Sequence, residues 1–195
     1  MTTIRMATPD DGAQVAEIYR PIVAETAISF EEEPPTAAEM ARRIEAGTSQ
    51  APWLACESGG RIFGYAYASR HRERAAYRWS VDVSVYVREA HRRTGVGRAL
   101  YTSLFALLRL QGFCAAHAGI TLPNPASVRL HESMGFRPAG VYPLVGFKQG
   151  AWRDVGFWQL ALRERRGDPP VLLGMKELLA QPGYAAALAS GVLLL

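Results

Sequence analysis

The sequence predicts an α/β fold in which helices cover both faces of a mixed β-sheet. Two observations indicate this class. Short apolar runs with strand periodicity alternate along the chain with longer stretches in which apolar residues recur at helical spacing. In the middle, residues 79–135 have the order strand, basic glycine loop, helix, strand and capped helix. The rest of the chain adds strands and helices on either side of this unit.

Composition and charge narrow the class of protein. Of the 195 residues, 49% are hydrophobic and 21% are charged, which is ordinary for a globular domain with its own core. The formal net charge of +4 comes from arginines spread over several predicted elements, so we expect no nucleic-acid partner. No run approaches the roughly 18 apolar residues of a membrane span, and the N-terminus lacks the pattern of a secretory signal. We expect a cytoplasmic protein with no membrane partner.

The two cysteines indicate neither a disulfide framework nor a metal site. Cys56 and Cys114 each lie in an apolar segment and have no metal-ligand spacing. We therefore expect reduced thiols in the core and no bound metal.

The N-terminal part is predicted to contain two helices and three strands. Asp10 and Asp11 can cap a helix, and Thr36 can cap a second helix that Gly47 ends. A glycine turn between two apolar runs predicts a hairpin. The predicted segments are strand 4–7, a helix to about residue 23, a brief extended piece at 27–30, a helix to about residue 46, and strands 53–57 and 62–68.

Residues 70–78 form a charged connection that contains four arginines. One interpretation is a solvated loop. The other is a set of bidentate partners for an anionic ligand.

A valine-rich strand at 81–87 has two different faces. Its odd positions are all valine, so period-two alternation places four β-branched side chains on one buried face. Asp82, Ser84 and Tyr86 share the other face. A carboxylate in mid-strand means either that this face is solvated or that it lines a cleft, and both interpretations stay open.

A basic glycine loop follows, from Arg92 to Arg98, and a leucine stripe predicts a helix from Val96 to Gly112. Gly95 and Gly97 allow a ligand to approach main-chain N–H groups at the helix start, where the helix dipole also favours an anion such as pyrophosphate. The spacing is neither a Walker loop nor a dinucleotide fingerprint, so a simple helix-start turn is the alternative.

The C-terminal part is predicted to complete the sheet and to end in a tail. Asn124 and Pro125 form a strong helix start, and Gly135 ends that helix. Strands are predicted at 113–120, 136–145 and 155–162, with 146–152 as a connection. We expect one catalytic domain over residues 1–163, followed by a linker and an apolar tail over 164–195. The tail docks on the domain, docks on a partner subunit or stays disordered.

With these segments in view, the sequence resembles the GCN5-related N-acetyltransferase (GNAT) superfamily, and within it the phosphinothricin and methionine sulfoximine acetyltransferases. The resemblance covers about residues 3–162. Its most specific segments are Val85–Val87, the loop Arg92–Gly97, Leu122–Asn124, Ser127–Glu132 and Gly156–Gln159. It implies the GNAT fold, with a mixed but mostly antiparallel sheet, and direct transfer of acetyl from acetyl-CoA to a primary amine.

The resemblance also implies a coenzyme site. In this family acetyl-CoA lies along the strand that matches Val85–Val87, its pyrophosphate lies on the glycine loop, and the residue that matches Asn124 contacts the pantetheine arm. The implied coenzyme-binding residues are Val85, Tyr86, Val87, Arg93, Thr94, Gly95, Val96, Gly97, Arg98, Asn124 and Ser127. Helix capping is also a complete explanation of Asn124.

Two catalytic residues follow from the resemblance. Asp82 matches the glutamate usually proposed as the general base, but its arm is one methylene shorter. Three interpretations stay open: Asp82 removes the proton directly, it does so through a bridging water, or it is not the base. His131 matches a position near the leaving sulfur, where it would protonate the departing thiolate. The alternative is a histidine packed in its helix beside Leu130 and Met134.

The implied amine site suits a small amino-acid-like substrate such as phosphinothricin or methionine sulfoximine, with resistance to such a herbicide or antibiotic as the consequence. The matching residues are Phe30, Arg72, Glu73, Arg74 and Tyr77. Arginines suit a carboxylate together with phosphinate or sulfoximine oxygens. This chain has His71 where the family has a tryptophan, and Gln149 and Arg153 replace histidines of the relatives.

Two other functions stay open. One is acetylation of a polyamine, an aminoglycoside or a protein N-terminus. The other is a non-catalytic acyl-CoA-binding module, which the shortened base and the extra tail favour. The resembled enzymes are typically dimers with the amine site near the subunit interface, so we expect a homodimer.

Overall fold

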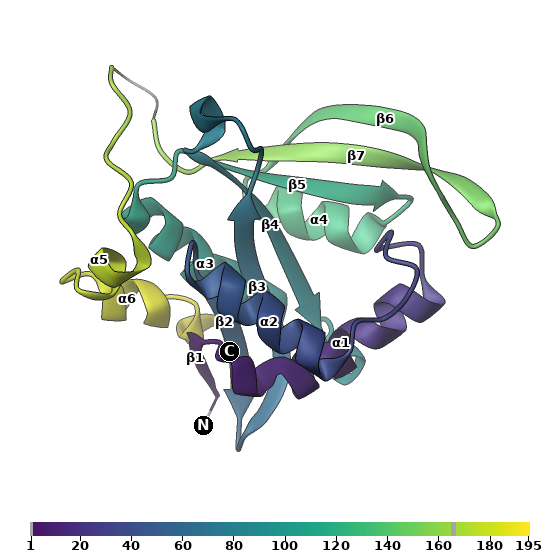
Figure 1. The fold of residues 1–195 in the computed structure, drawn as a ribbon, viewed down its shortest axis with the longest axis horizontal. Coiled ribbons are helices and arrows are strands. Elements are labelled where there is room, and N and C mark those ends of the chain that lie inside the picture. Colours follow the sequence, from purple (N-terminus) through teal and green to yellow (C-terminus); the bar gives the residue numbers. More distant parts are fainter. Residues whose placement is uncertain (1, 165–166) are drawn as a thin grey trace.

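The computed structural model describes residues 2–164 and 167–195, and it has one central sheet with helices on both faces (Figure 1). The sheet has seven strands in the spatial order β1-β2-β3-β4-β5-β7-β6. Among these described strands, β4 and β5 are parallel and the other neighbours are antiparallel. The strands are β1 (Thr3–Met6), β2 (Trp53–Ser58), β3 (Arg61–Arg70), β4 (Ser80–Val87), β5 (Ala115–Leu122), β6 (Arg137–Lys148) and β7 (Ala151–Ala161). The predicted mixed, mostly antiparallel sheet is confirmed.

Helices α1 and α2 cover one face of the sheet, whereas α3 and α4 cover the other (Figure 1). The described α-helices are α1 (Gly12–Glu25), α2 (Ala37–Thr48), α3 (Val96–Gln111), α4 (Pro125–Ser133), α5 (Met175–Leu179) and α6 (Tyr184–Ala189). Four short 3₁₀ turns accompany them, η1 (Pro9–Asp11), η2 (Ala75–Tyr77), η3 (Glu89–His91) and η4 (Val192–Leu194). None of the described helices combines the length and the apolar character that a bilayer crossing requires.

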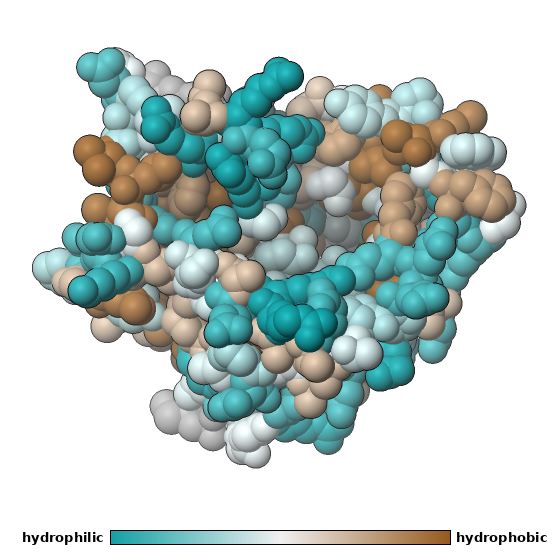
Figure 2. Space-filling model, viewed as in Figure 1, coloured by the Kyte–Doolittle hydropathy of each residue, from teal (hydrophilic) through white to brown (hydrophobic). Residues whose placement is uncertain are grey.

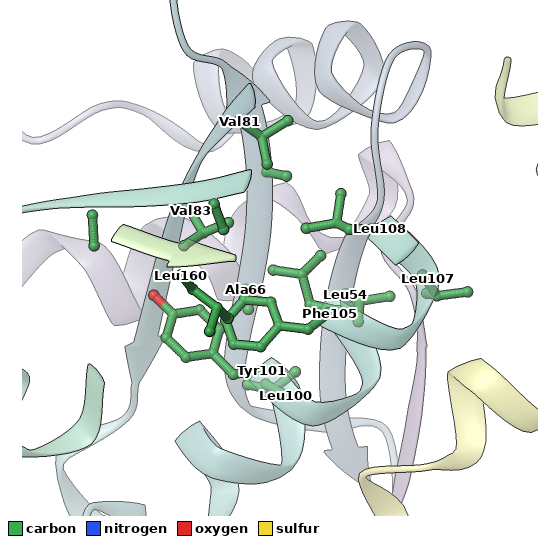
Figure 3. Close-up of a cluster of buried hydrophobic side chains, with 14 of the residues drawn as sticks. Leu54, Ala66, Val81, Val83, Leu100, Tyr101, Phe105, Leu107, Leu108 and Leu160 are labelled. Atoms are coloured by element: carbon green, nitrogen blue, oxygen red, sulfur yellow. The ribbon is translucent and has the colours of Figure 1, made fainter. Parts of the chain in front are cut away.

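The valine face of β4 forms the larger core with α3 (Figure 3). Val81 and Val83 are buried against α3, where Leu100 and Leu104 have no exposed surface. Burying one such side chain contributes about 1.5–3 kcal/mol, so this face serves stability. Helix α3 ends as predicted at Gly112, whose left-handed φ of 104° is unfavourable for other residues.

The opposite face of the sheet carries aromatic residues beneath α1 and α2. Trp53 stacks on Tyr67 with ring centroids 4.2 Å apart, and Tyr86 meets Tyr19 of α1 edge-on at 4.9 Å. Because side chains alternate along a strand, Asp82 points to this aromatic face and not to the valine face.

Three local predictions are wrong. Asp11 does not cap α1 with its side chain, because both carboxylate oxygens accept hydrogen bonds from Arg5 at 2.7 Å. Residues 27–30 are not an extended piece, because the chain bends at residues 27–29, where Ser29 is bonded to α1 and to the end of β6. Residues 146–152 are not a loop, because β6 and β7 extend into them and turn at Gln149 and Gly150, which both have positive φ.

The C-terminal tail docks along α3. Ser103 Oγ on α3 donates to the Leu188 carbonyl at 2.7 Å and accepts from the Gly191 N–H at 3.0 Å. Gly191 lies so close to α3 that a side chain there would collide with the Ala99 carbonyl. Residues 165–166 of the predicted linker lie outside the described residues, and the division at residue 163 stays a prediction.

Candidate active site

The parallel pair β4–β5 opens into a gap. Main-chain pairing joins residues 80–82 of β4 to residues 115–117 of β5 and stops there, whereas β3 pairs with β4 as far as Val87. The edge of β4 that faces β5 over residues 83–87 therefore presents N–H and C=O groups that have no partner among the described strands. An extended ligand that contains amide groups can pair with such an edge.

Asp82 lies at the apex of this gap. It is the last residue of β4 that pairs with β5, opposite His117, and it pairs with Ser69 of β3 on its other side. Its side chain is 40% exposed. Burial raises the pKa of this carboxyl above its ordinary value, whereas the hydrogen bond from His71 and the charge of Arg72 lower the pKa in part. The carboxylate is thus half-buried where the two strands separate.

His71 covers the Asp82 carboxylate. Its Nδ1 lies 2.8 Å from Asp82 Oδ1, and its ring stacks on His117 with centroids 4.1 Å apart. Tyr77 of η2 lies edge-on to the same ring at 5.9 Å. This cluster forms because η2 folds the chain back after β3 ends. The structure thereby brings two of the predicted substrate residues to this pair, since Tyr77 contacts the His71 ring and the charge of Arg72 acts on Asp82.

Phe30 belongs to a second wall, which the segment between α1 and α2 forms. Its ring packs so closely on Gly146 of β6 that a side chain at this glycine would collide with it. The next residue, Glu31, accepts two hydrogen bonds from Arg43 of α2 at 2.8 and 3.0 Å. Phe30 therefore lies against β6, on a different element from the segment 72–77, in which Glu73 and Arg74 are exposed.

Lys148 at the end of β6 is hydrogen-bonded to the segment between α1 and α2. It was not among the predicted site residues. Its buried Nζ donates to the carbonyls of Val23, Ser29 and Glu31 at 2.7, 2.7 and 2.6 Å, so each of the three N–H bonds has an acceptor. Burial lowers the pKa of this ammonium, and the charges of Glu31 and Glu32 raise it in part. No sequence pattern marks such a residue, because a single lysine beside a turn is typical of a solvated surface.

The glycine loop has the geometry of an anion site. Gly95 and Arg93 have left-handed φ values of 93° and 64°, and the N–H groups of the first turn of α3 have no acceptor within the helix. The arginines of this loop are exposed. A Cβ added to Gly97 would lie 3.7 Å from Val87, so the loop adjoins the open edge of β4. One extended ligand can therefore reach both.

Helix α4 begins as the sequence predicts. Asn124 Oδ1 accepts a hydrogen bond from the Ser127 N–H at 3.1 Å, which is the expected N-cap. The cap uses the amide oxygen, whereas the amide nitrogen can still donate to a ligand. The capping role is confirmed, and the coenzyme contact stays a prediction.

His131 lies in the core between α4 and α3. Its Nδ1 is 2.8 Å from the Ser127 carbonyl, so Nδ1 carries the proton, and its Nε2 accepts from the Tyr101 hydroxyl at 3.0 Å. The residue is buried. Burial lowers the pKa of this imidazole, and the bond to Ser127 raises it in part, so the ring is neutral. To protonate a thiolate through Nε2, His131 would first have to give up its hydrogen bond with the Tyr101 hydroxyl.

A hollow opens in the face that carries α1 and α2, between the hydrophilic segment after β3 and the hairpin β6–β7 (Figure 2). On this side of the sheet, a cavity of about 410 Å³ adjoins Ser69, the strand partner of Asp82. It is lined by Tyr19, Met40, Arg43, Ala46, Gly47, Gln50, Trp53, Tyr65, Tyr67, Ala68, Ser69 and Arg70. These residues were not predicted, although the alternation of Tyr65, Tyr67 and Ser69 along one strand could have shown that they share a face.

Comparison with known proteins identifies the family. Residues 4–156 match the model of the acetyltransferase (GNAT) domain. The chain belongs to the GNAT family. It is an acyltransferase of the N-acetyltransferase type, and the predicted fold is confirmed.

Individual relatives extend over most of this N-acetyltransferase. The phosphinothricin N-acetyltransferase of Streptomyces viridochromogenes is 42% identical over 156 residues, which cover 80% of this chain and 85% of the relative. The L-methionine sulfoximine/L-methionine sulfone acetyltransferase of Salmonella typhimurium is 37% identical over 163 residues, which cover 83% and 95%. A solved phosphinothricin acetyltransferase from Sinorhizobium meliloti in complex with acetyl-CoA has a TM-score of 0.82 and 37% identity, covering 87% of this chain and 93% of that one.

Proposed function

We propose that this enzyme transfers acetyl from acetyl-CoA to the primary amine of a small amino-acid-like substrate of the phosphinothricin or methionine sulfoximine type. One observation carries the proposal: Asp82 lies at the apex of the β4–β5 gap, beside the arginine-bearing segment that ends in η2. The relatives named for these two substrates support it. Acetylation would mask the amine of such a compound, which makes resistance the expected consequence.

The coenzyme would lie along the open edge of β4 and on the glycine loop. Main-chain groups of Val85, Tyr86 and Val87 would pair with the amides of the pantetheine arm, and Asn124 and Ser127 would contact the same arm. The N–H groups from Arg93 to Arg98 would hold the pyrophosphate. Two features of the chain support this fit, the absence of a described strand partner over residues 83–87 and the nearness of Gly97 to Val87. When bound, acetyl-CoA supplies the activated acetyl thioester.

The amine site would bind a zwitterion and remove a proton from its ammonium group. Arg72 and Arg74 would bind the carboxylate and the second anionic group, Glu73 would face the ammonium, and Phe30 and Tyr77 would pack against the carbon chain. Removal of the proton depends on Asp82. His131 stays a candidate for protonating the departing thiolate.

The function is tested by thiol release from acetyl-CoA with a panel of amines. The panel contains L-phosphinothricin, L-methionine sulfoximine, spermidine, kanamycin and a peptide with a free N-terminus. We expect turnover with one of the first two that depends on Asp82 and is lost in Asp82→Asn. Turnover with spermidine, kanamycin or the peptide alone would overturn the substrate class. Tight acetyl-CoA binding with no transfer to any amine would favour a binding module.

We also propose a homodimer whose interface includes the β6–β7 hairpin. Strand β6 is an edge strand, and the hairpin carries large apolar residues that are each at least half exposed (Figure 2). They are Val141, Tyr142, Leu144, Val145, Phe147 and Trp152. Exposed apolar patches of this kind typically mark protein interfaces. Light scattering should give twice the mass of one chain, and Leu144→Glu should reduce it to one. A monomeric wild type would contradict the proposal.

We place the enzyme in the cytoplasm. Both cysteines are free thiols buried in the core, which suits a reducing compartment. Cell fractionation of the native host tests this placement, and recovery outside the cytoplasmic fraction would contradict it.

A further inference from the structure

His71 and Asp82 form a hydrogen-bonded pair at the apex of the β4–β5 gap. The partner of Nδ1 is a carboxylate oxygen at 2.8 Å, and an ionised carboxylate only accepts hydrogen bonds. Nδ1 therefore carries a proton, and in the neutral form of the ring the lone pair lies on Nε2. No hydrogen bond reaches Nε2 of His71 from the part of the chain that the structure describes. Nε2 of His71 is therefore a basic nitrogen with no hydrogen-bond partner among the described residues.

The surroundings hold this ring in one orientation. His117 of β5 stacks on it with an interplanar angle of 15°, and Tyr77 of η2 meets it edge-on. Arg72 donates from Nη1 to the main-chain carbonyl of His71 at 2.8 Å, which fixes the backbone at this point. The charged and titratable groups that face the ring are Asp82, His117, Tyr77 and Arg72. The side chain of His71 is 15% exposed, so solvent and ligands still reach it.

The Asp82 side chain is more exposed than the His71 ring, but one of its two oxygens is already used. Oδ1 of Asp82 is already bonded to His71, and the ring lies between this oxygen and η2. The arm of Asp82 is also short, so its reach from the β4 backbone is small. An imidazole on this carboxylate extends the reach of the base toward the segment that carries Arg72 and Tyr77.

We propose that His71 is the general base of this enzyme, with Nε2 as the proton acceptor and Asp82 as the residue that orients and stabilises it. The inference rests on the proposed acetyl transfer to an amine. A carboxylate on Nδ1 fixes the tautomer and stabilises the imidazolium that forms, as it does in other catalytic histidine–carboxylate pairs.

The step balances as follows. The substrate ammonium gives one proton to Nε2 of His71, which leaves a lone pair on the amine nitrogen. That nitrogen forms a bond to the thioester carbonyl carbon, and the carbon–sulfur bond breaks. The nitrogen loses its second proton to solvent as the amide forms, and the thiolate of CoA takes up a proton. The imidazolium, paired with Asp82, returns its proton to solvent before the next turnover.

The alternative is that His71 only holds the Asp82 carboxylate, which then removes the proton through a water molecule. The two roles differ in one respect that kinetics can measure. If His71 is the base, free imidazole should restore activity to a variant that lacks the ring. If His71 only holds the carboxylate, added imidazole should have no effect.

The test compares wild type, His71→Gln, His71→Ala and Asp82→Asn with L-phosphinothricin and L-methionine sulfoximine as probes. We expect kcat to fall at least about 100-fold in His71→Gln, with KM for acetyl-CoA within about twofold of wild type. Imidazole should raise kcat of His71→Ala at least about tenfold in a pH-dependent way, and it should not rescue Asp82→Asn. His91→Gln, which removes a ring stacked on Phe63, is the matched control and should stay within about twofold of wild type.

The outcomes distinguish a failure of the base assignment from a failure of the proposed function. Wild-type kcat in His71→Gln, together with a strong loss in Asp82→Asn, would overturn the role of His71 and leave the acetyl transfer intact. Loss of activity in His71→Ala that imidazole does not restore, in a protein whose thermal unfolding is unchanged, would also overturn it. A wild type with no turnover on any amine would overturn the proposed function and the base assignment together.

Discussion

Two histidines of this enzyme both donate a hydrogen bond from Nδ1, but they differ at Nε2 and in their surroundings. His131 donates from Nδ1 to the Ser127 carbonyl and accepts at Nε2 from Tyr101, inside the core. His71 donates from Nδ1 to the Asp82 carboxylate at the apex of a gap and has no described donor at Nε2. An imidazole with both nitrogens bonded in the core contributes structure. An imidazole that keeps one lone pair at an accessible site, with a carboxylate behind it, is equipped to move a proton.

The largest expected effect is at Asp82. Asp82→Asn keeps the shape of the side chain but removes the charge that supports the imidazolium, so we expect kcat to fall about 10²- to 10⁴-fold. The KM for acetyl-CoA should change little, because Asp82 lies outside the glycine loop and the open edge of β4. Steady-state kinetics at several pH values measure both constants. A fall in kcat smaller than tenfold in Asp82→Asn would mean that the carboxylate does not support a catalytic His71, so His71 and His131 would no longer differ in role.

A smaller effect, on stability, is expected at His131. His131→Ala leaves the Tyr101 hydroxyl buried without its partner and creates a cavity, which together cost about 2–4 kcal/mol. Urea unfolding measures the loss. The double variant Tyr101→Phe with His131→Leu removes both polar partners and should lose less than His131→Ala alone.

The same variants test whether His131 has a catalytic role. If His131 only contributes structure, the stable double variant should keep kcat within about threefold of wild type. A loss of kcat above 100-fold in that folded variant would place His131 in the chemistry and make the two histidines alike.

Lys148 can be compared with the two histidines, because each N–H of its ammonium group donates to a main-chain carbonyl within the fold. Lys148→Met leaves three main-chain carbonyls without their donor, so we expect a loss of about 1–3 kcal/mol in the free energy of unfolding. Because two of these carbonyls, those of Ser29 and Glu31, flank Phe30, the KM for the amine should rise several-fold while the KM for acetyl-CoA stays the same. Lys176→Met, which changes an exposed lysine of α5, is the matched control. Equal changes in both KM values would indicate a general loss of fold instead.

The smallest expected effect is a dependence of stability on pH. Burial holds the pKa of His131 in the folded protein below the value of 6.5 for an unperturbed histidine, so the unfolded chain binds this proton first as the pH falls. The stability that neutral His131 confers is complete above this value and is lost as the pH falls through it toward the folded pKa. Unfolding midpoints between about pH 7.5 and 5 should show a steeper decline for wild type than for the double variant, and equal slopes would contradict the assignment.

The sequence predicted the elements whose signals are local. Thr36 and Asn124 cap their helices as expected, each side chain accepting a hydrogen bond from the N–H three residues on. The valine alternation over 81–87 fixed which face of β4 is buried, and with it the face of Asp82. These signals depend on neighbours along the chain, so they can be interpreted without a structure.

Features that depend on tertiary contacts were not predictable in this way. Position 71 was noticed only as a departure from the family, because its bond to Asp82 exists only after η2 folds back over β4. Lys148 was missed because its acceptors lie more than 100 residues away in the sequence. The tail is similar, since its apolar composition fits docking on the domain, docking on a partner and disorder alike.

The docked tail also bears on how this protein can be handled in the laboratory. A side chain at Gly95 would collide with the carbonyl oxygen of Leu194, at 2.9 Å from an added Cβ, so the last residues of the chain lie against the glycine loop. Any peptide fused after Leu195, including a purification tag, therefore starts beside the proposed entrance for the phosphates of the coenzyme. Kinetic constants are best measured with the tag at the other terminus or removed.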